Sequence, residues 1–92
     1  MRLGKSLMPT KARLTLTGSW AKVTNGNPAL VQLQNGSARI HVGSATPAAD
    51  STAFHLLDMD GERTFQYLAS GENVYAKAYS SKLDTFIVVT ET

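Results

Sequence analysis

Cysteine is absent from this chain of 92 residues, so neither a disulfide nor a thiolate metal site can support its fold. The only 2 histidines, His41 and His55, lie far apart in the sequence, which argues against a structural zinc site. A domain of this size has a small margin of stability, and its usual supports are disulfides, metals and oligomerisation. These absences leave self-association as the expected support.

Long apolar runs are absent as well. No run approaches the roughly 18 residues that a helix needs to span a bilayer. The first residues, MRLGKSLMPTKAR, are basic but lack the apolar block of a secretory signal peptide. We expect no membrane association and no export by the general secretory pathway.

The small net charge of +2 conceals an asymmetry along the chain. No acidic residue precedes Asp50, whereas six of the 9 cations do, and all 7 acids lie from Asp50 onward. Halves of opposite sign favour head-to-tail contact between copies, or docking of a basic arm on an acidic neighbour. The alternative is that the order of the strands mixes the two halves in the fold.

The chain does contain a series of short strand-like runs separated by turn signals. The run ARLTLT alternates apolar and polar residues, as a half-buried strand does. Asn35-Gly36 favours a type I′ turn and predicts a hairpin of residues 30–34 with 37–42. The pattern predicts an all-β fold, a single small β-sandwich of jelly-roll or immunoglobulin-like type without a long helix. The eight expected strands are 12–17, 20–23, 29–34, 37–42, 53–57, 62–68, 73–79 and 85–90.

The sequence divides into an N-terminal extended arm, residues 1–10, and a β-sandwich domain, residues 11–92. The arm has no periodicity, and the longest irregular stretch inside the domain is 43–52. Alternation assigns one side chain in two to the core. The expected core residues are Leu14, Leu16, Trp20, Val31, Leu33, Ile40, Val42, Phe54, Leu56, Phe65, Tyr67, Val74, Ala76, Phe86 and Val88.

Patterns for catalysis or metal binding are weak. No nucleophile motif accompanies His41 or His55. Residues 58–62, DMDGE, contain part of a calcium loop but lack its other ligands, and a β-turn explains the Asp-Gly pair equally well. The glycines fall at turns, and none forms a phosphate-binding loop. We therefore expect neither an enzyme nor a bound cofactor.

The residues left for function are the arm and the outer sides of strands. Tyr75, Lys77 and Tyr79 share one side of a predicted strand and could stack bases, but no cluster of cations joins them, so we expect no nucleic-acid binding. Tyrosines on strands more often pack or form interfaces. The run FIVV at 86–89 is apolar on both sides, so it is a central strand or its outer side meets a partner. The expected interface residues are Arg2, Leu3, Lys5, Leu7, Met8, Tyr75, Lys77, Tyr79, Ile87 and Val89.

Several segments, taken in order, resemble small virion proteins of tailed bacteriophages. They are TLTGSWAKV (15–23), ALVQLQN (29–35), VGSATP (42–47), FHL (54–56), NVYAKA (73–78) and VVTE (88–91). Head-decoration, cement and fibre-base domains often combine W-x-x-V, a V-Q-L/N-x-N/S-G hairpin, a G-x-x-P loop and x-V-Y-A-K. The resemblance covers most of residues 12–91, and its motifs are mainly the turns and strands of a small sandwich.

The resemblance implies a non-enzymatic, oligomeric structural protein of the particle. We expect a capsid decoration (cement) protein, a homotrimer, that bridges neighbouring subunits of the major capsid protein or other virion proteins. Its location would be the virion, assembled in the host cytoplasm. The alternatives are a tail or head-fibre base domain or, from another class, a carbohydrate-binding module that uses Trp20, Tyr75 and Tyr79.

Overall fold

A computed structural model describes residues 13–80 and 84–91 of the chain. All regular elements of this part are β-strands, so the prediction of an all-β fold is confirmed, and each expected run holds one strand. Within the same residues no helix is long and apolar enough to cross a bilayer. The strands are β1 (Leu14–Leu16), β2 (Ala21–Lys22), β3 (Ala29–Asn35), β4 (Ser37–Gly43), β5 (His55–Asp58), β6 (Thr64–Tyr67), β7 (Asn73–Ala78) and β8 (Thr85–Glu91).

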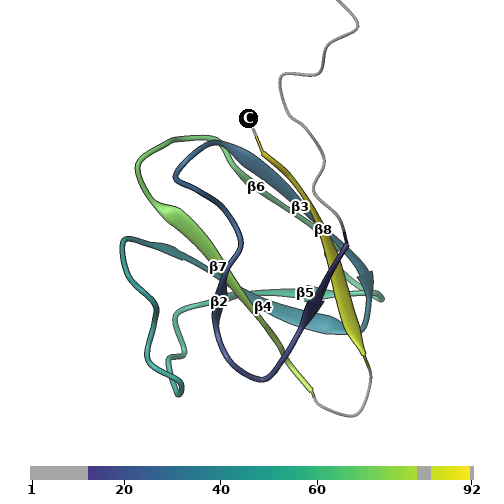
Figure 1. Cartoon of the computed structure of the whole chain (residues 1–92). Helices are drawn as coiled ribbons and strands as arrows, with labels where there is room; N and C mark the ends of the chain where they lie inside the picture. The colour runs from purple at the N-terminus through teal and green to yellow at the C-terminus, as the bar shows by residue number, and fades with distance from the viewer. Residues whose placement is uncertain (1–12, 81–83, 92) are drawn as a thin grey trace, which may run out of the picture.

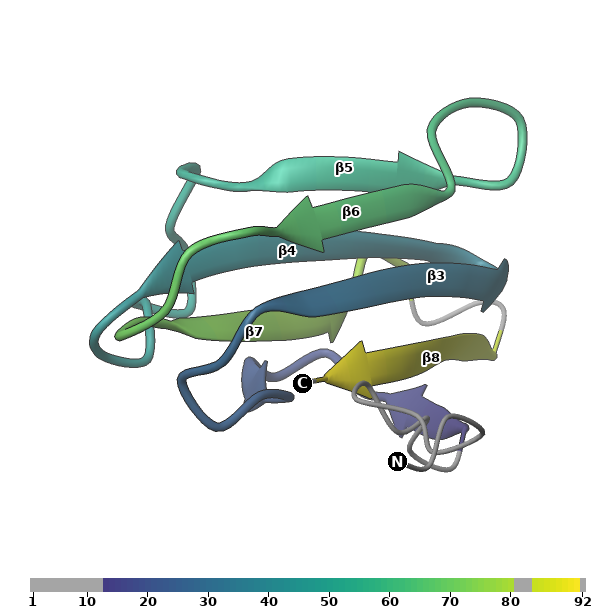
Figure 2. The same cartoon turned by 90° about the horizontal axis from the view of Figure 1, so that it is seen from above.

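The strands form a sandwich of two 4-stranded antiparallel sheets (Figure 1). Sheet A has the order β1-β8-β3-β6, and sheet B has the order β2-β7-β4-β5. Figure 2 shows the edge strands β5 and β6 together at one end of the sandwich, with the purple β1 and β2 at the other. Eight strands divided in this order between two sheets form a jelly roll.

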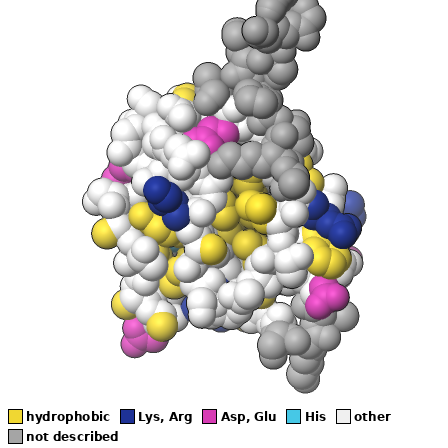
Figure 3. Space-filling view, in the orientation of Figure 1, with side chains coloured by type: hydrophobic (Ala, Val, Ile, Leu, Met, Phe, Trp, Pro, Cys, Tyr) yellow, Lys and Arg dark blue, Asp and Glu magenta, His cyan; other side chains and the backbone are white. Residues whose placement is uncertain are grey.

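The order of the strands also determines how the charged residues of the two halves of the sequence are distributed over the described part of the fold. Each sheet alternates a strand from the basic first half of the chain with a strand from the acidic second half. Figure 3 shows Lys and Arg side chains scattered among Asp and Glu on one face of the molecule. On the same face, apolar side chains reach the surface between β1 and β2. Within residues 13–80 and 84–91 the charges of the two halves are therefore interleaved, whereas Arg2, Lys5 and Lys11 lie outside the described residues.

The core lies between the two sheets and consists of the inward side of each strand. Ile40, Val74 and Ile87 are fully buried there. Burial of a side chain of this size contributes about 1.5–3 kcal/mol relative to exposure, so this cluster is the main source of stability. The buried apolar cluster comprises Leu16, Val23, Ala29, Val31, Leu33, Ala38, Ile40, Leu57, Tyr67, Val74, Ala76, Ile87 and Val89, with Leu14, Val42, Met59, Phe65 and Ala78 packed against it.

The strand β8 presents to the core the side opposite to the predicted one. Phe86 and Val88, expected inside, are half-buried, and the core side chains are Ile87 and Val89, which are fully buried. A strand that is apolar on both sides offers no polar residue to mark its outer side. A shift of one residue then exchanges the two faces.

The same inversion occurs on β5, where Leu57 is buried in the core and Leu56 is 45% exposed. Phe54, which precedes β5, is half-buried and lies outside the core cluster. Trp20 was also expected inside, but it lies half-buried against Lys77 on the outer side of sheet B. Leu56, Phe54 and Trp20 thus lie on sheet B or beside it, whereas the other two expected core residues that face outward, Phe86 and Val88, lie on sheet A.

The hairpin predicted across Asn35-Gly36 is wrong. Strand β3 pairs with β6 and β8, whereas β4 pairs with β5 and β7, so the turn carries the chain from one sheet to the other. Gly36 has the positive φ, +80°, that the sequence predicts there. The local sequence does not show that the start of β8 packs against this turn. Asn35 donates from Nδ2 to the Asp84 carbonyl at 2.7 Å, and Thr85 fills the space beside Gly36.

Candidate functional site

The outer side of sheet B gathers aromatic and cationic side chains. In the register of the sheet, Arg39 of β4 stands opposite Leu56 of β5 and Lys77 of β7. One step along the strands, His41 stands opposite Tyr75. Intervening side chains of the same strands point into the core, so the sheet fixes these groups on a single surface.

Segment 44–54, between β4 and β5, covers one half of this surface. Trp20 donates from Nε1 to the Ala48 carbonyl at 3.2 Å. Lys77 donates from Nζ to the Ala49 carbonyl at 2.7 Å, and its ammonium lies 5.1 Å from the centroid of the Trp20 ring. Lys77 is only 6% exposed, a degree of burial that a lysine reaches when its charge has such partners.

Replacing Lys77 with Met should loosen segment 44–54 without unfolding the sandwich. Met keeps most of the apolar stem but cannot donate to the carbonyl, so the loop loses a charge-assisted hydrogen bond. We expect a loss of about 1–2 kcal/mol in the free energy of unfolding. Trp20 is the only tryptophan of the chain, so its fluorescence reports on the loop directly. Its emission should shift to longer wavelength.

The matched control is Lys22→Met on the neighbouring strand β2, where the lysine is exposed. This change should leave both Trp20 emission and amide exchange in segment 44–54 as they are. If Lys77→Met also left them unchanged, the hydrogen bond to Ala49 would not be what holds the loop on sheet B.

The other half of the surface remains accessible. The guanidinium of Arg39 lies between two rings, with Cζ 4.8 Å from the centroid of Phe54 and 4.6 Å from that of Tyr79. Leu56 is 45% exposed and Tyr79 is 50% exposed. This surface, the Arg39 face, consists of Arg39, Phe54, Leu56 and Tyr79. Contact with two rings restricts the guanidinium, and its planar fork of donors suits a planar anion such as a carboxylate.

The charge of Arg39 has no counter-ion within the described residues, with which it makes only its two ring contacts. Its Nε is buried and lacks a hydrogen-bond partner. Asp58 stands opposite Ser37 on the same side of the sheet, but its carboxylate accepts hydrogen bonds from Ser37 Oγ at 3.4 Å and the Asp60 amide at 3.0 Å. A buried donor left unpaired lowers stability, so Arg39 is a poor choice for the fold alone.

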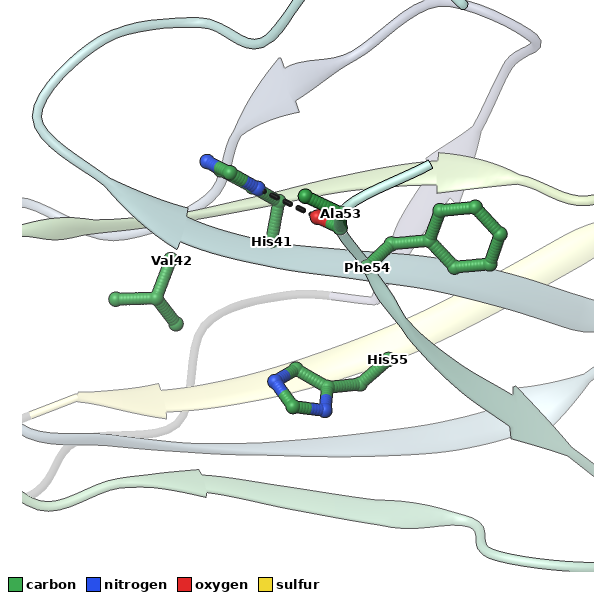
Figure 4. A pocket seen from close by; sticks show the side chains of 5 residues that line it. All are labelled: His41, Val42, Ala53, Phe54 and His55. Atoms are coloured by element: carbon green, nitrogen blue, oxygen red, sulfur yellow. Dashed lines mark hydrogen bonds between the residues drawn. The ribbon is translucent and has the colours of Figure 1, made fainter. Parts of the chain in front are cut away.

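A pocket of about 350 Å³ opens beside the Arg39 face, where β4 and β5 separate. The ladder between these strands ends at Ile40 and His55, and His41 then donates from Nδ1 to the Ala53 carbonyl at 2.7 Å. Figure 4 shows the Phe54 ring pointing away from both histidines. Among residues 13–80 and 84–91, no three His, Cys, Asp or Glu side chains gather closely enough to hold a metal ion.

A second pocket, of about 230 Å³, lies where segment 44–54 meets β7 and the turn before β2. Hydroxyl groups, an indole ring and an ammonium group surround it. The lining residues are Gly18, Ser19, Trp20, Thr46, Pro47, Ala49 and Lys77.

The structure corrects most of the predicted interface residues that it describes. Tyr79 is exposed as expected, whereas Tyr75 and Lys77 are 4% and 6% exposed. Ile87 and Val89 are fully buried in the core because β8 is turned by one residue relative to the prediction. None of these four buried side chains offers an exposed surface to a partner protein, although Lys77 also lines a pocket. The remaining predicted interface residues, Arg2, Leu3, Lys5, Leu7 and Met8, lie outside the described residues.

Arg39, Phe54 and Leu56 were not predicted as members of the candidate site. Alternation along the strands places Arg39 on the outer side, as the structure does, but it places Phe54 and Leu56 in the core. One local signal was available: Arg39 is the only cation of the run SARIHVG, so its strand has one clearly polar side. The partners of that side depend on the pairing of β4 with β5 and β7, which no local pattern gives.

The chain matches no protein-family model, no curated protein and no solved structure. The features available for assigning function are thus the strand order and the Arg39 face. On this face the guanidinium contacts two rings, and the exposed Leu56 stands opposite it in the sheet.

Proposed function

We propose that this chain is a structural protein of a virus particle, of the decoration (cement) type, which binds the assembled capsid and stabilises it. The observation that carries the proposal is the strand order, β1-β8-β3-β6 facing β2-β7-β4-β5. This is the jelly-roll order, which is widespread among viral capsid domains. The resemblance of the sequence to small virion proteins of tailed bacteriophages points in the same direction.

The Arg39 face supplies a contact surface suited to this role. Arginine and tyrosine are enriched among the residues that dominate protein interfaces. A second contact is needed to bridge two capsid subunits, and we assign it to the arm, residues 1–10, whose sequence combines cations with apolar residues. The trimeric state and the use of the arm remain predictions. A tail or head-fibre base is the alternative location within the same class.

Purified particles of the virus that encodes the chain should contain it at a fixed ratio to the major capsid protein. Adding the purified protein to particles that lack it should raise the temperature at which the shell opens, because a ligand of the assembled shell stabilises that state. At a concentration of about 100 times Kd, the gain is about 2.7 kcal/mol per bound site. Mass spectrometry gives the ratio, and calorimetry gives the temperature shift.

As a control, the same protein is unfolded irreversibly by heat and added to the particles at equal concentration. This control separates stabilisation by specific binding from a nonspecific effect of added protein. Absence of the chain from purified particles, together with no shift on addition, would rule out the decoration role. Its presence at only a few copies per particle would favour the tail or head-fibre location.

A carbohydrate-binding module is the second candidate, and the 230 Å³ pocket is the observation in its favour. Trp20 supplies a ring there, and Ser19, Thr46 and Lys77 surround it with hydrogen-bonding groups. Tyr75, which was also expected to take part, is buried and cannot do so. Binding to a glycan array that is lost in Trp20→Ala would support this function.

A further inference from the structure

We propose that the Arg39 face docks a protein segment that presents a carboxylate between apolar side chains. The inference deepens the proposed function by naming the chemistry of the capsid contact. Its test on particles, described below, rests on the proposed function. The first argument is charge complementarity. Arg39 stands opposite Lys77 in the sheet, and no described acid forms an ion pair with either cation. Like charges directly opposite are unfavourable in a sheet, and an incoming anion removes this penalty.

The second argument is the guanidinium of Arg39, which has no ion-pair partner among the described residues. Arg39 Nε is buried without a hydrogen-bond partner, while the guanidinium is held between Phe54 and Tyr79. The stacking fixes the orientation of the guanidinium, and a carboxylate approaching in its plane would accept two parallel hydrogen bonds. Because Nε is buried, these hydrogen bonds would come from the terminal Nη1 and Nη2 groups of Arg39, which are not buried without a partner as Nε is.

The third argument is the surroundings of the guanidinium, which favour a protein partner over a nucleic acid. Both rings already contact the guanidinium, so they are not free platforms for bases. Lys77 is buried with its ammonium donating to the Ala49 carbonyl, which leaves one accessible cation on the face. A nucleic-acid site needs several cations along a backbone path. Leu56 and Tyr79 instead offer apolar area beside a single charge, as in a protein interface.

Nuclear magnetic resonance titration tests the chemistry without a particle. The probes are the capped tripeptide Leu-Asp-Leu and its amide counterpart Leu-Asn-Leu. The carboxylate peptide should shift the Arg39 Nε–H signal and the amides of β4, β5 and β7 in a saturable way, and the amide peptide should bind at least about 5-fold more weakly. The proposal is overturned if the two peptides bind equally, if neither shifts these signals, or if a single-stranded oligonucleotide shifts them more strongly.

The key variant is Arg39→Met, which keeps the apolar stem and removes both the charge and the unpaired donor. Because the donor is unsatisfied in the free protein, Tm should stay within about 4 °C of the original value or rise. Binding of the carboxylate peptide should be lost. A role in the fold alone predicts the reverse, a lower Tm with unchanged binding. Arg39→Lys keeps the charge without the planar fork and should recover only part of the affinity.

On particles that lack the native protein, Arg39→Met should weaken binding by about 30-fold or more, and Leu56→Ala by about 5-fold. The matched controls lie off the face: Arg63→Met at an exposed arginine and Leu68→Ala at a leucine that is 78% exposed should bind as the original protein does. If the original protein and Arg39→Met bind particles equally well, the docking proposal fails while the decoration role stands. If no protein binds particles but the peptide titration succeeds, the decoration role fails and the carboxylate site stands.

Discussion

Gly36→Ala is expected to lower the free energy of unfolding by about 3 kcal/mol or more, a large share of the stability of a domain of this size. Two effects add. Residue 36 has a φ of +80°, which side chains other than that of glycine rarely adopt. A Cβ there would also collide with Thr85 Oγ1 and approach the Asp84 carbonyl oxygen to 2.9 Å. Strand β8 cannot move aside easily because β1 and β3 hold it on both edges.

Two other glycines separate these effects in urea denaturation. Gly71 has a φ of +103° but nothing within 4 Å of the position of a Cβ, so Gly71→Ala should show the backbone strain alone, about 1–2 kcal/mol. Gly61 has neither a positive φ nor a close neighbour, and Gly61→Ala should be nearly neutral. A loss at Gly36 no greater than that at Gly71 would mean that β8 does not pack against the turn between the sheets.

Val89→Ala and Val88→Ala should differ strongly although they make the same chemical change in one strand. Val89 is fully buried, and removing two of its carbons should cost about 2–3 kcal/mol, including the cavity left behind. Val88 is half-buried on the outer side of β8, so Val88→Ala should cost less than about 1 kcal/mol. Chemical denaturation of the two variants under identical conditions measures the difference.

The pair decides which side of β8 faces the core. A larger loss at Val88 than at Val89 would mean that Phe86 and Val88 point inward, as the alternation in the sequence predicts, and that the strand is turned over relative to this structure. An equal loss at both positions would indicate that a partner buries the outer side of β8.

The positions of the strands could be predicted because they depend on local signals. Alternation and turn residues are local signals that lie within a few positions of each other. They do not depend on how the strands are arranged in the sheets. Sidedness was predicted correctly where polar residues mark the outer side, as Gln32 does between Val31 and Leu33 on β3. It failed on β8, where the sequence is apolar on both sides and burial depends on distant strands.

The pairing of the strands and the candidate site could not be predicted for a related reason. Asn35-Gly36 has the chemistry of a hairpin turn, yet the best partner of β3 is β8, far along the chain. The Arg39 face requires β4, β5 and β7 in a fixed register. It also requires two rings from outside these strands, Phe54 just before β5 and Tyr79 just after β7. The burial of Lys77 depends on segment 44–54, whose small residues have no periodicity. The residues that meet on the outer side of sheet B can therefore be identified only from the three-dimensional structure.

The central position of β8 in sheet A has a consequence for how the chain folds. Paired strands are nested around the middle of the sequence, from β4 with β5 to β1 with β8, where Leu14 pairs with Ile87. Contacts of such sequence separation make folding slow, in the range of milliseconds to seconds. During synthesis β1 has no partner and β3 has one open edge until β8 leaves the ribosome. For that interval the nascent chain presents unpaired strands to its neighbours, and this is when chaperones or rapid completion of the chain protect it from aggregation.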